Sequence, residues 1–199
     1  MISIGFGVVN RHLRHAGKGS TYDNRCYVAM VFEGSNLERR SCGLSFGLRG
    51  MTALESLDLS YYSSLNNLRG LRKLTSLLRL NLTHCEAVAE FSAAQALTSM
   101  THLRLWGCTA LTDLSPLQGL RQLPCLDLNC CGALSDLSNL EGLPELERLI
   151  LTGCNGLTDM SAWLGLVVLR SVTWSECSPL GALEAQLAGG PHARTRGCP

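Results

Sequence analysis

The sequence predicts an α/β repeat solenoid, in which short parallel strands stack on one side and return segments stack on the other. The first observation is the apolar phrase Met100-Thr-His-Leu-Arg-Leu-Trp-Gly-Cys108, with its large apolar residues three, then two, then three positions apart. The second is its recurrence with a 23-residue period, because the third apolar position falls at 59, 82, 105, 128, 151 and 174. A constant period in this range is the signature of stacked repeats.

The return segments are predicted from the apolar residues after the cysteine position. In the best-formed coil these residues recur at every third position: Leu111, Leu114, Leu117 and Leu120. A three-residue period favours 3₁₀ or extended turns over an α-helix, although a short helical segment would also fit. Ser115-Pro116 fits the start of such a turn, with the serine as the cap and the proline in the first position. Serine recurs there at Ser138 and Ser161.

The repeats divide the chain into three parts. About six coils cover residues 48–186, where no coil can bury its leucines alone. Residues 1–47 do not follow the period, and we expect a tail and an N-terminal cap there, with a buried strand at Tyr27–Phe32. Residues 187–199 are expected to be a disordered tail. The sequence shows no convincing C-terminal cap, which favours end-to-end association or a fragment of a longer repeat protein.

Composition excludes several classes of function. Hydrophobic residues make up 46% and charged residues 17%, and the net charge is +1, so no global field would attract nucleic acid. The sequence has neither a secretory signal nor an apolar run long enough to span a membrane, so we expect a cytoplasmic protein. It also lacks the common phosphate-loop and zinc-protease motifs, and we expect no cofactor.

These motifs resemble the leucine-rich repeat family over roughly residues 48–186. In the first coil, Tyr62 stands in the slot of that family's ladder asparagine. In the other five coils a cysteine replaces the asparagine: Cys85, Cys108, Cys131, Cys154 and Cys177. The rest of each coil resembles the short repeats of internalin-type and phosphatase-regulatory members, and of kinetoplastid repeat proteins. The resemblance implies a curved parallel sheet whose concave face binds a protein partner, but it implies no particular partner.

Outward-facing residues follow from the alternation of side chains along a strand. Three columns result, each with one residue per coil. The first is Ser56, Arg79, His102, Cys125, Arg148 and Ser171; the second is Asp58, Asn81, Arg104, Asp127, Ile150 and Thr173; the third is Ser60, Thr83, Trp106, Asn129, Thr152 and Ser175. An outward tryptophan beside an arginine is typical of a binding hot spot. We therefore predict a partner site at Trp106, Arg104, His102, Arg79, Asp127 and Arg148. The plainer alternatives are an isolated exposed aromatic and an Arg104–Asp127 surface pair of little energetic weight.

The aligned cysteines favour a structural interpretation. Strand spacing would permit disulfides, yet an odd number of inward thiols and no visible secretion signal favour buried, reduced side chains that donate weakly to turn carbonyls. One cysteine per coil forms a line and not a tetrahedron, so zinc is not expected. Asp113, Asp136 and Asp159 also repeat, and turn-capping accounts for them better than calcium does.

Cys125 is the exception, because it is expected to point outward between His102 and Arg148. Those neighbours would favour a thiolate, and Cys130 also has an accessible position. No oxyanion donor or orienting third residue is evident, so catalysis is disfavoured.

The function predicted from the sequence is a non-enzymatic protein–protein interaction module. The alternatives are a regulatory inhibitor or scaffold for an enzyme such as a phosphatase, a thiol-dependent enzyme or redox sensor that uses Cys125, and a truncated remnant of a longer repeat protein.

Overall fold

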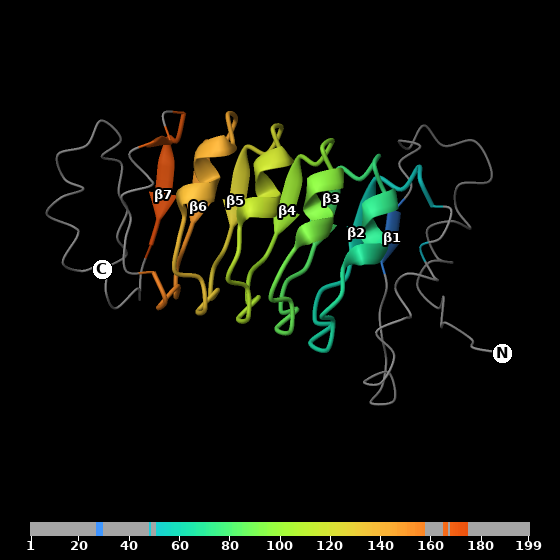
Figure 1. Ribbon diagram of the computed structural model, residues 1–199, viewed down its shortest axis with the longest axis horizontal. Helices are drawn as coiled ribbons and strands as arrows, with labels where there is room; N and C mark the ends of the chain where they lie inside the picture. The colour runs from blue at the N-terminus through green and yellow to red at the C-terminus, as the bar shows by residue number, and fades with distance from the viewer. Residues whose placement is uncertain (1–26, 30–47, 49–50, 158–164, 167, 175–199) are drawn as a thin grey trace, which may run out of the picture.

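The computed structural model describes residues 27–29, 48, 51–157, 165–166 and 168–174. Within these residues the chain forms one seven-stranded parallel sheet whose strands follow each other in chain order (Figure 1). The strands are β1 (Tyr27–Ala29), β2 (Ser56–Asp58), β3 (Arg79–Asn81), β4 (His102–Arg104), β5 (Cys125–Asp127), β6 (Arg148–Ile150) and β7 (Ser171–Thr173). The predicted solenoid with a parallel sheet is confirmed.

The register of the sheet follows the sequence period. Leu57 pairs with Leu80 and Leu80 with Leu103, so that each step across the sheet is one repeat of the sequence. The first pairing differs, since Tyr27 lies opposite Ser56, which is a longer step along the chain than one repeat. The structure therefore places a strand at Tyr27–Ala29, within the segment where the sequence predicts one. Residues 30–47 and 175–199 lie outside the described residues, so the N-terminal cap, the C-terminal tail and the domain boundaries remain predictions.

Among the described residues, the return segments contain four 3₁₀ helices, which form a second row alongside the strands (Figure 1). They are η1 (Arg69–Lys73), η2 (Ser92–Ala96), η3 (Ser115–Gly119) and η4 (Ser138–Gly142). Their hydrogen bonds join residues three apart, as where the N–H of Leu71 donates to the carbonyl of Leu68 and that of Leu74 to Leu71. Because these apolar residues face the core, the three-residue bonds satisfy backbone groups that water cannot reach. The three-residue sequence period thus predicts the correct helix type.

The predicted serine cap is wrong. Ser115 is the first residue of η3 and Pro116 the second, and Leu114 stands at the N-cap without a side-chain cap hydrogen bond. Asp113 Oδ1 accepts the N–H of Ser115 at 2.8 Å, and its Oδ2 accepts the Ser115 hydroxyl at 2.8 Å. Asp136 binds Ser138 in the same way, at 2.8 and 2.7 Å. Each aspartate binds both donors at once, as in an Asx turn, so the predicted turn-capping role is confirmed for Asp113 and Asp136. Asp159 and Ser161 lie outside the described residues.

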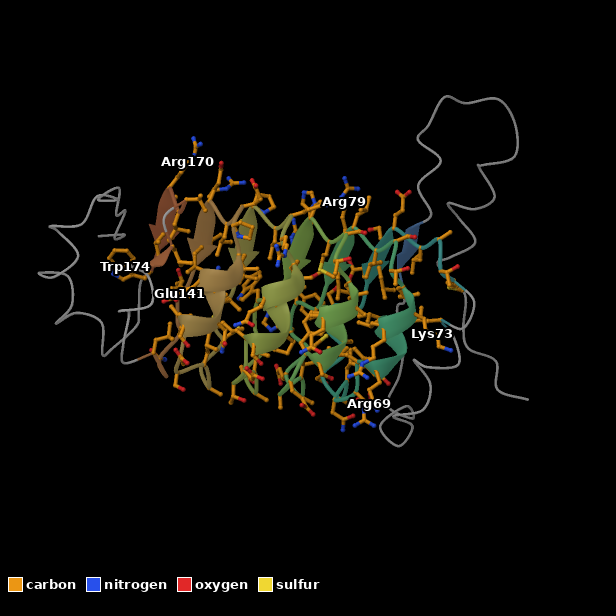
Figure 2. All side chains as sticks on the ribbon, turned by 45° about the horizontal axis from the view of Figure 1, so that its top comes forward. Arg69, Lys73, Arg79, Glu141, Arg170 and Trp174 are labelled. Carbon is orange, nitrogen blue, oxygen red and sulfur yellow. The ribbon has the colours of Figure 1, made fainter. Side chains whose placement is uncertain are left out.

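The core is one continuous stack of aliphatic side chains between the strands and the return segments. Every coil contributes leucines that are almost fully buried, and the third apolar position is 0% exposed at Leu59, Leu82, Leu105, Leu128 and Leu151. In the last described coil Trp174 takes this position and is 7% exposed, beside β7 in Figure 2. A neighbouring coil covers each leucine layer, so the sheet face opposite the core is the surface free to display polar side chains.

Candidate binding surface on the sheet

The register brings the predicted binding residues together on the outer face of the sheet. Arg79 pairs with His102, and Arg104 lies between Asn81 and Asp127 in the next column. Cys125 pairs with Arg148 on the following strands. The arginines and His102 are exposed, Asp127 and Cys125 are half-buried, and Trp106, just beyond β4, is 43% exposed.

The coils of β2, β3 and β5 share a polar turn at the end of the strand. Asp58 Oδ1 accepts the N–H of Ser60 at 2.9 Å and its hydroxyl at 2.7 Å. Asn81 Oδ1 accepts the corresponding groups of Thr83 at 3.1 and 2.6 Å. In the β5 coil, the Asp127 carboxylate accepts the N–H of Asn129 at 3.1 Å. In each case the second-column side chain closes the turn, so much of its hydrogen-bonding capacity is used within the protein.

The β4 coil departs from this pattern. Its second-column residue is Arg104, which has no acceptor with which to close the turn, and its third-column residue is Trp106 instead of a small polar residue. Both side chains are exposed. This coil therefore places a cation and an indole on the surface, where its neighbours place residues that stabilise their own turns.

The local charge on this part of the face is positive. Burial, followed by the charges of Arg79 and Arg104, holds the pKa of His102 below its ordinary value of 6.5. Arg104 and Asp127 are register partners, but within the described chain the side-chain ion pair is found elsewhere, between Arg170 and Glu147 at 3.3 Å. The Arg104 guanidinium is thus available to an external carboxylate.

A fourth column on the turns next to the sheet escaped the sequence reasoning. It comprises Tyr61, His84, Gly107, Cys130 and Gly153, and each has a left-handed backbone with φ between 57° and 74°. This conformation costs an L-residue other than glycine roughly 1–2 kcal/mol. The two glycines, in the same slot of the period, were the signal that could have identified it.

Two residues of this column form a ring stack with the predicted tryptophan. The Tyr61 and His84 rings are stacked, with centroids 5.1 Å apart and planes 21° apart. The His84 ring lies 5.3 Å from that of Trp106, with the planes 47° apart. Three aromatic side chains on successive coils therefore form a continuous surface, which begins at Trp106 and ends at Tyr61, whose side chain is 72% exposed.

The ladder cysteines lie on the other side of the turns, in the core. Each of the four described ones is fully buried, is not in a disulfide, and donates its thiol to a leucine carbonyl of the preceding coil. The distances from Sγ to the carbonyl oxygen are 3.1 Å for Cys85, 3.3 Å for Cys108, 3.2 Å for Cys131 and 3.0 Å for Cys154. Each of these thiols therefore forms a hydrogen bond that links its own coil to the preceding coil. Cys177 lies outside the described residues.

Comparison with known proteins gives structural neighbours only, since no protein-family model and no curated protein sequence matches this chain. The functional domain of InlJ from Listeria monocytogenes, which includes a cysteine ladder, superposes with a TM-score of 0.50 and 23% identity. The match covers 62% of this chain and 26% of that one. The chain has the leucine-rich repeat fold. This assignment concerns the fold, as predicted from the repeat motif and the cysteine ladder.

Two further solved structures from Listeria monocytogenes are similar to this leucine-rich repeat protein. An internalin, InlF, is 25% identical with a TM-score of 0.48, over 63% of this chain and 42% of its own. Internalin C2 is 27% identical with a TM-score of 0.44, over 64% of each chain. The leucine-rich repeat protein therefore spans less than two-thirds of the length of each of these three structures.

The structure corrects the expectation for Cys125 in this leucine-rich repeat protein. The sequence predicts a thiolate favoured by cationic neighbours, but the pKa of Cys125 is raised above its ordinary value of 9.0. Burial is the largest cause; Arg148 and Arg104 act in the opposite direction, and Asp127 adds to the increase. The half-buried position outweighs the two cations, so Cys125 is held as the neutral thiol. Cys130, by contrast, is exposed.

The described portion of the repeat protein holds neither a cluster of metal ligands nor a membrane-spanning helix. No three histidine, cysteine or acidic side chains gather there in a way that could hold a metal ion. The helices described there are all too short to cross a bilayer.

Proposed function

We propose that this leucine-rich repeat protein is a non-enzymatic module that binds a protein partner on the concave face of its sheet, which is the face opposite the leucine core. The observation that carries the proposal is the β4 coil, where Arg104 and Trp106 replace the turn-closing residues of the β2, β3 and β5 coils. Tryptophan and arginine are the residue types most often found at binding hot spots. The binding set comprises Trp106, Arg104, His102, Arg79, Asp127 and Arg148.

The mechanism is the display of side chains on a rigid support. Strand residues on this face are held by pairing on both sides, as where Arg104 lies between Asn81 and Asp127. The leucines beneath them are fully packed. A partner would therefore meet side chains whose backbone is already ordered, so little conformational entropy would oppose binding.

The charges on the face indicate how association would respond to salt. Arg79, Arg104 and Arg148 are exposed, whereas the acidic side chains of the same columns, Asp58 and Asp127, are half-buried and accept hydrogen bonds in their turns. Exposed cations would accelerate encounter with an acidic surface, and this acceleration weakens as salt shortens the Debye length.

The test is affinity capture from a native lysate in reducing buffer, with the wild type beside a Trp106→Ala, Arg104→Glu double variant. The matched charge-reversal control is Arg69→Glu on η1, which lies well away from Arg79 (Figure 2). All three proteins must first show the same circular dichroism. We expect a stoichiometric partner that the wild type and the Arg69→Glu control retain and the double variant loses. Equal retention by all three proteins would refute the proposed site.

The cytoplasmic location and the end-to-end association of uncapped coils remain predictions from the sequence. The regulatory inhibitor is a special case of the proposed module and would require that the captured partner be an enzyme whose activity changes on binding.

A further inference from the structure

The ring stack joins Trp106 of the proposed binding set to two residues outside that set, Tyr61 and His84. Tyr61 and His84 lie on turns where the equivalent residues of two other coils, Gly107 and Gly153, are glycine. Glycine adopts this left-handed backbone without strain, so the turn itself does not require a ring there. The Tyr61 side chain is 72% exposed, and core packing therefore does not offset its strained backbone. Strain that packing does not explain is typical of functional positions.

The geometry of the stack determines which chemical groups it presents. The His84 ring contacts both of the others: the Tyr61 ring is stacked on it at 5.1 Å, and the tilted Trp106 ring lies 5.3 Å away. The electron-rich faces of aromatic rings attract cations, whereas their edges carry partial positive charge. The tyrosine hydroxyl and the indole and imidazole N–H groups at the ring edges are hydrogen-bond donors. The stack is therefore better suited to carboxylates than to cations.

The positive charges of the neighbouring arginines also favour carboxylates over cations. Arg104 is two residues from Trp106 in the same coil, and Arg79 lies in the next column on the adjacent strand. A continuous polyanion such as nucleic acid fits less well, because the acidic residues Asp58 and Asp127 flank Asn81 and Arg104 in the second column. In a peptide segment, by contrast, the carboxylates can be separated by apolar side chains that pack on the rings. Such a segment can keep its carboxylates away from Asp58 and Asp127.

We propose that the ring stack, together with Arg79 and Arg104, binds an acidic segment of a protein partner in which carboxylate and aromatic side chains alternate. This inference rests on the proposed function, since the two arginines belong to that site, and it adds Tyr61 and His84 to the surface. The segment would run from the sheet face across the turns of the β2, β3 and β4 coils.

The test uses fluorescence anisotropy with a short fluorescein-labelled peptide of alternating glutamate and tyrosine. A lysine–tyrosine peptide of the same length and an oligothymidylate serve as comparison probes. The decisive variant is Tyr61→Gly, which removes the ring and leaves the left-handed turn unstrained. Its matched control is Cys130→Gly, the same substitution in the same column on a coil outside the stack.

We expect the glutamate–tyrosine peptide to bind, and Tyr61→Gly to weaken its Kd roughly tenfold, as for a single hot-spot side chain. Cys130→Gly should leave the Kd unchanged, and the lysine–tyrosine peptide should not bind. Equal binding of the two peptides, or an unchanged Kd in Tyr61→Gly, would overturn the inference. Competition by the oligothymidylate as strong as by the acidic peptide would also overturn it, because the surface would then recognise polyanions in general.

A further variant, Arg104→Gln, separates the two proposals. If Arg104→Gln loses the peptide and Tyr61→Gly keeps it, the sheet-face site stands and the ring stack is excluded. If neither substitution matters and the partner capture also fails, both proposals are wrong.

Discussion

The imidazole of His84 occupies the space that a side chain on Gly107 would need. A Cβ at Gly107 would lie 2.6 Å from His84 Nδ1, too close for non-bonded atoms, and the backbone of Gly107 is left-handed with φ +73°. The left-handed backbone favours glycine at this position, and the ring of the preceding coil leaves no room for a side chain there. The His84 ring can lie beside the β4 coil because Gly107 has no side chain.

Gly107→Ala should destabilise the protein by about 1–2 kcal/mol from the backbone alone, with a further loss as the His84 ring moves. Urea denaturation followed by circular dichroism measures the change. Gly132→Ala is the matched control, because a Cβ there would meet no heavy atom within 4 Å, and it should stay within about 0.5 kcal/mol of wild type. Equal midpoints for the two variants would show that the ring does not constrain this turn.

The thiols should react with iodoacetamide in an order set by exposure. Cys130 is exposed, Cys125 is half-buried with a raised pKa, and Cys85 and Cys108 are fully buried. Because the thiolate is the nucleophile, the cysteines that the structure describes should be modified at pH 8 first at Cys130, then at Cys125, and at the ladder positions only in denaturant. Peptide mass spectrometry over time gives the order. Rapid labelling of Cys125 ahead of Cys130 would revive the redox-sensor alternative.

Stability should fall at alkaline pH because of the ladder. Burial raises the pKa of Cys85 from 9.0 to about 11 and that of Cys108 to about 12. The fold thus favours the neutral thiols, and their stabilising contribution is complete below pH 9 and declines from there up to the folded-state pKa. The slope is about 1.4 kcal/mol per pH unit for each thiol. Urea midpoints at pH 8 and 10 test this.

The controls for the alkaline loss are thiol deletions. A Cys85→Ala, Cys108→Ala variant starts from lower stability, since each alanine leaves a cavity and removes one hydrogen bond, but it should lose less between pH 8 and 10. Cys130→Ala, which removes an exposed thiol, should retain the wild-type slope. An unchanged slope in the double variant would mean that other groups cause the alkaline loss.

Asp136→Ala should reduce stability by about 1 kcal/mol, because the carboxylate holds the first residue of η4. The backbone N–H of Ser138, and then its hydroxyl, hold the pKa of Asp136 below its ordinary value of 3.8. A lowered folded-state pKa stabilises above the unfolded value, so the advantage over the variant should shrink as the pH falls through 3.8 and below. Glu145→Ala, which removes another exposed carboxylate, is the control and should show a smaller effect. Equal losses in the two variants would exclude a specific cap.

Several features of the site were predictable because they depend only on the period. Arg79, His102, Arg104 and Trp106 occupy defined slots of the repeat, and a parallel stack with a fixed repeat length must place equivalent slots side by side. The 3₁₀ segments are predictable for the same reason, because leucines buried at every third position favour backbone hydrogen bonds between residues three apart. The strand at Tyr27–Ala29 is predicted by its composition, but its pairing with β2 does not follow the period.

The remaining features depend on contacts between coils. Whether Cys125 is a thiolate depends on how deeply the neighbouring strands bury it, and that depth outweighs the charges that the sequence makes evident. Tyr61 and His84 escaped notice because their slot is defined by a backbone conformation, which a tyrosine or histidine does not reveal. Turn-capping by Asp113 was predictable from its repetition, but it is evident only in the folded turn that Ser115 donates both its N–H and its hydroxyl to that carboxylate.

The sequence by itself determined the solenoid, its parallel register and the side of the sheet on which each leucine and arginine lies, because a 23-residue period leaves one way to bury the apolar positions together. Only the tertiary structure decided which polar residues are used in closing turns, which cations remain available, and that three rings from successive coils meet. The physical reason is that these properties arise from distances between neighbouring coils, which no single repeat encodes.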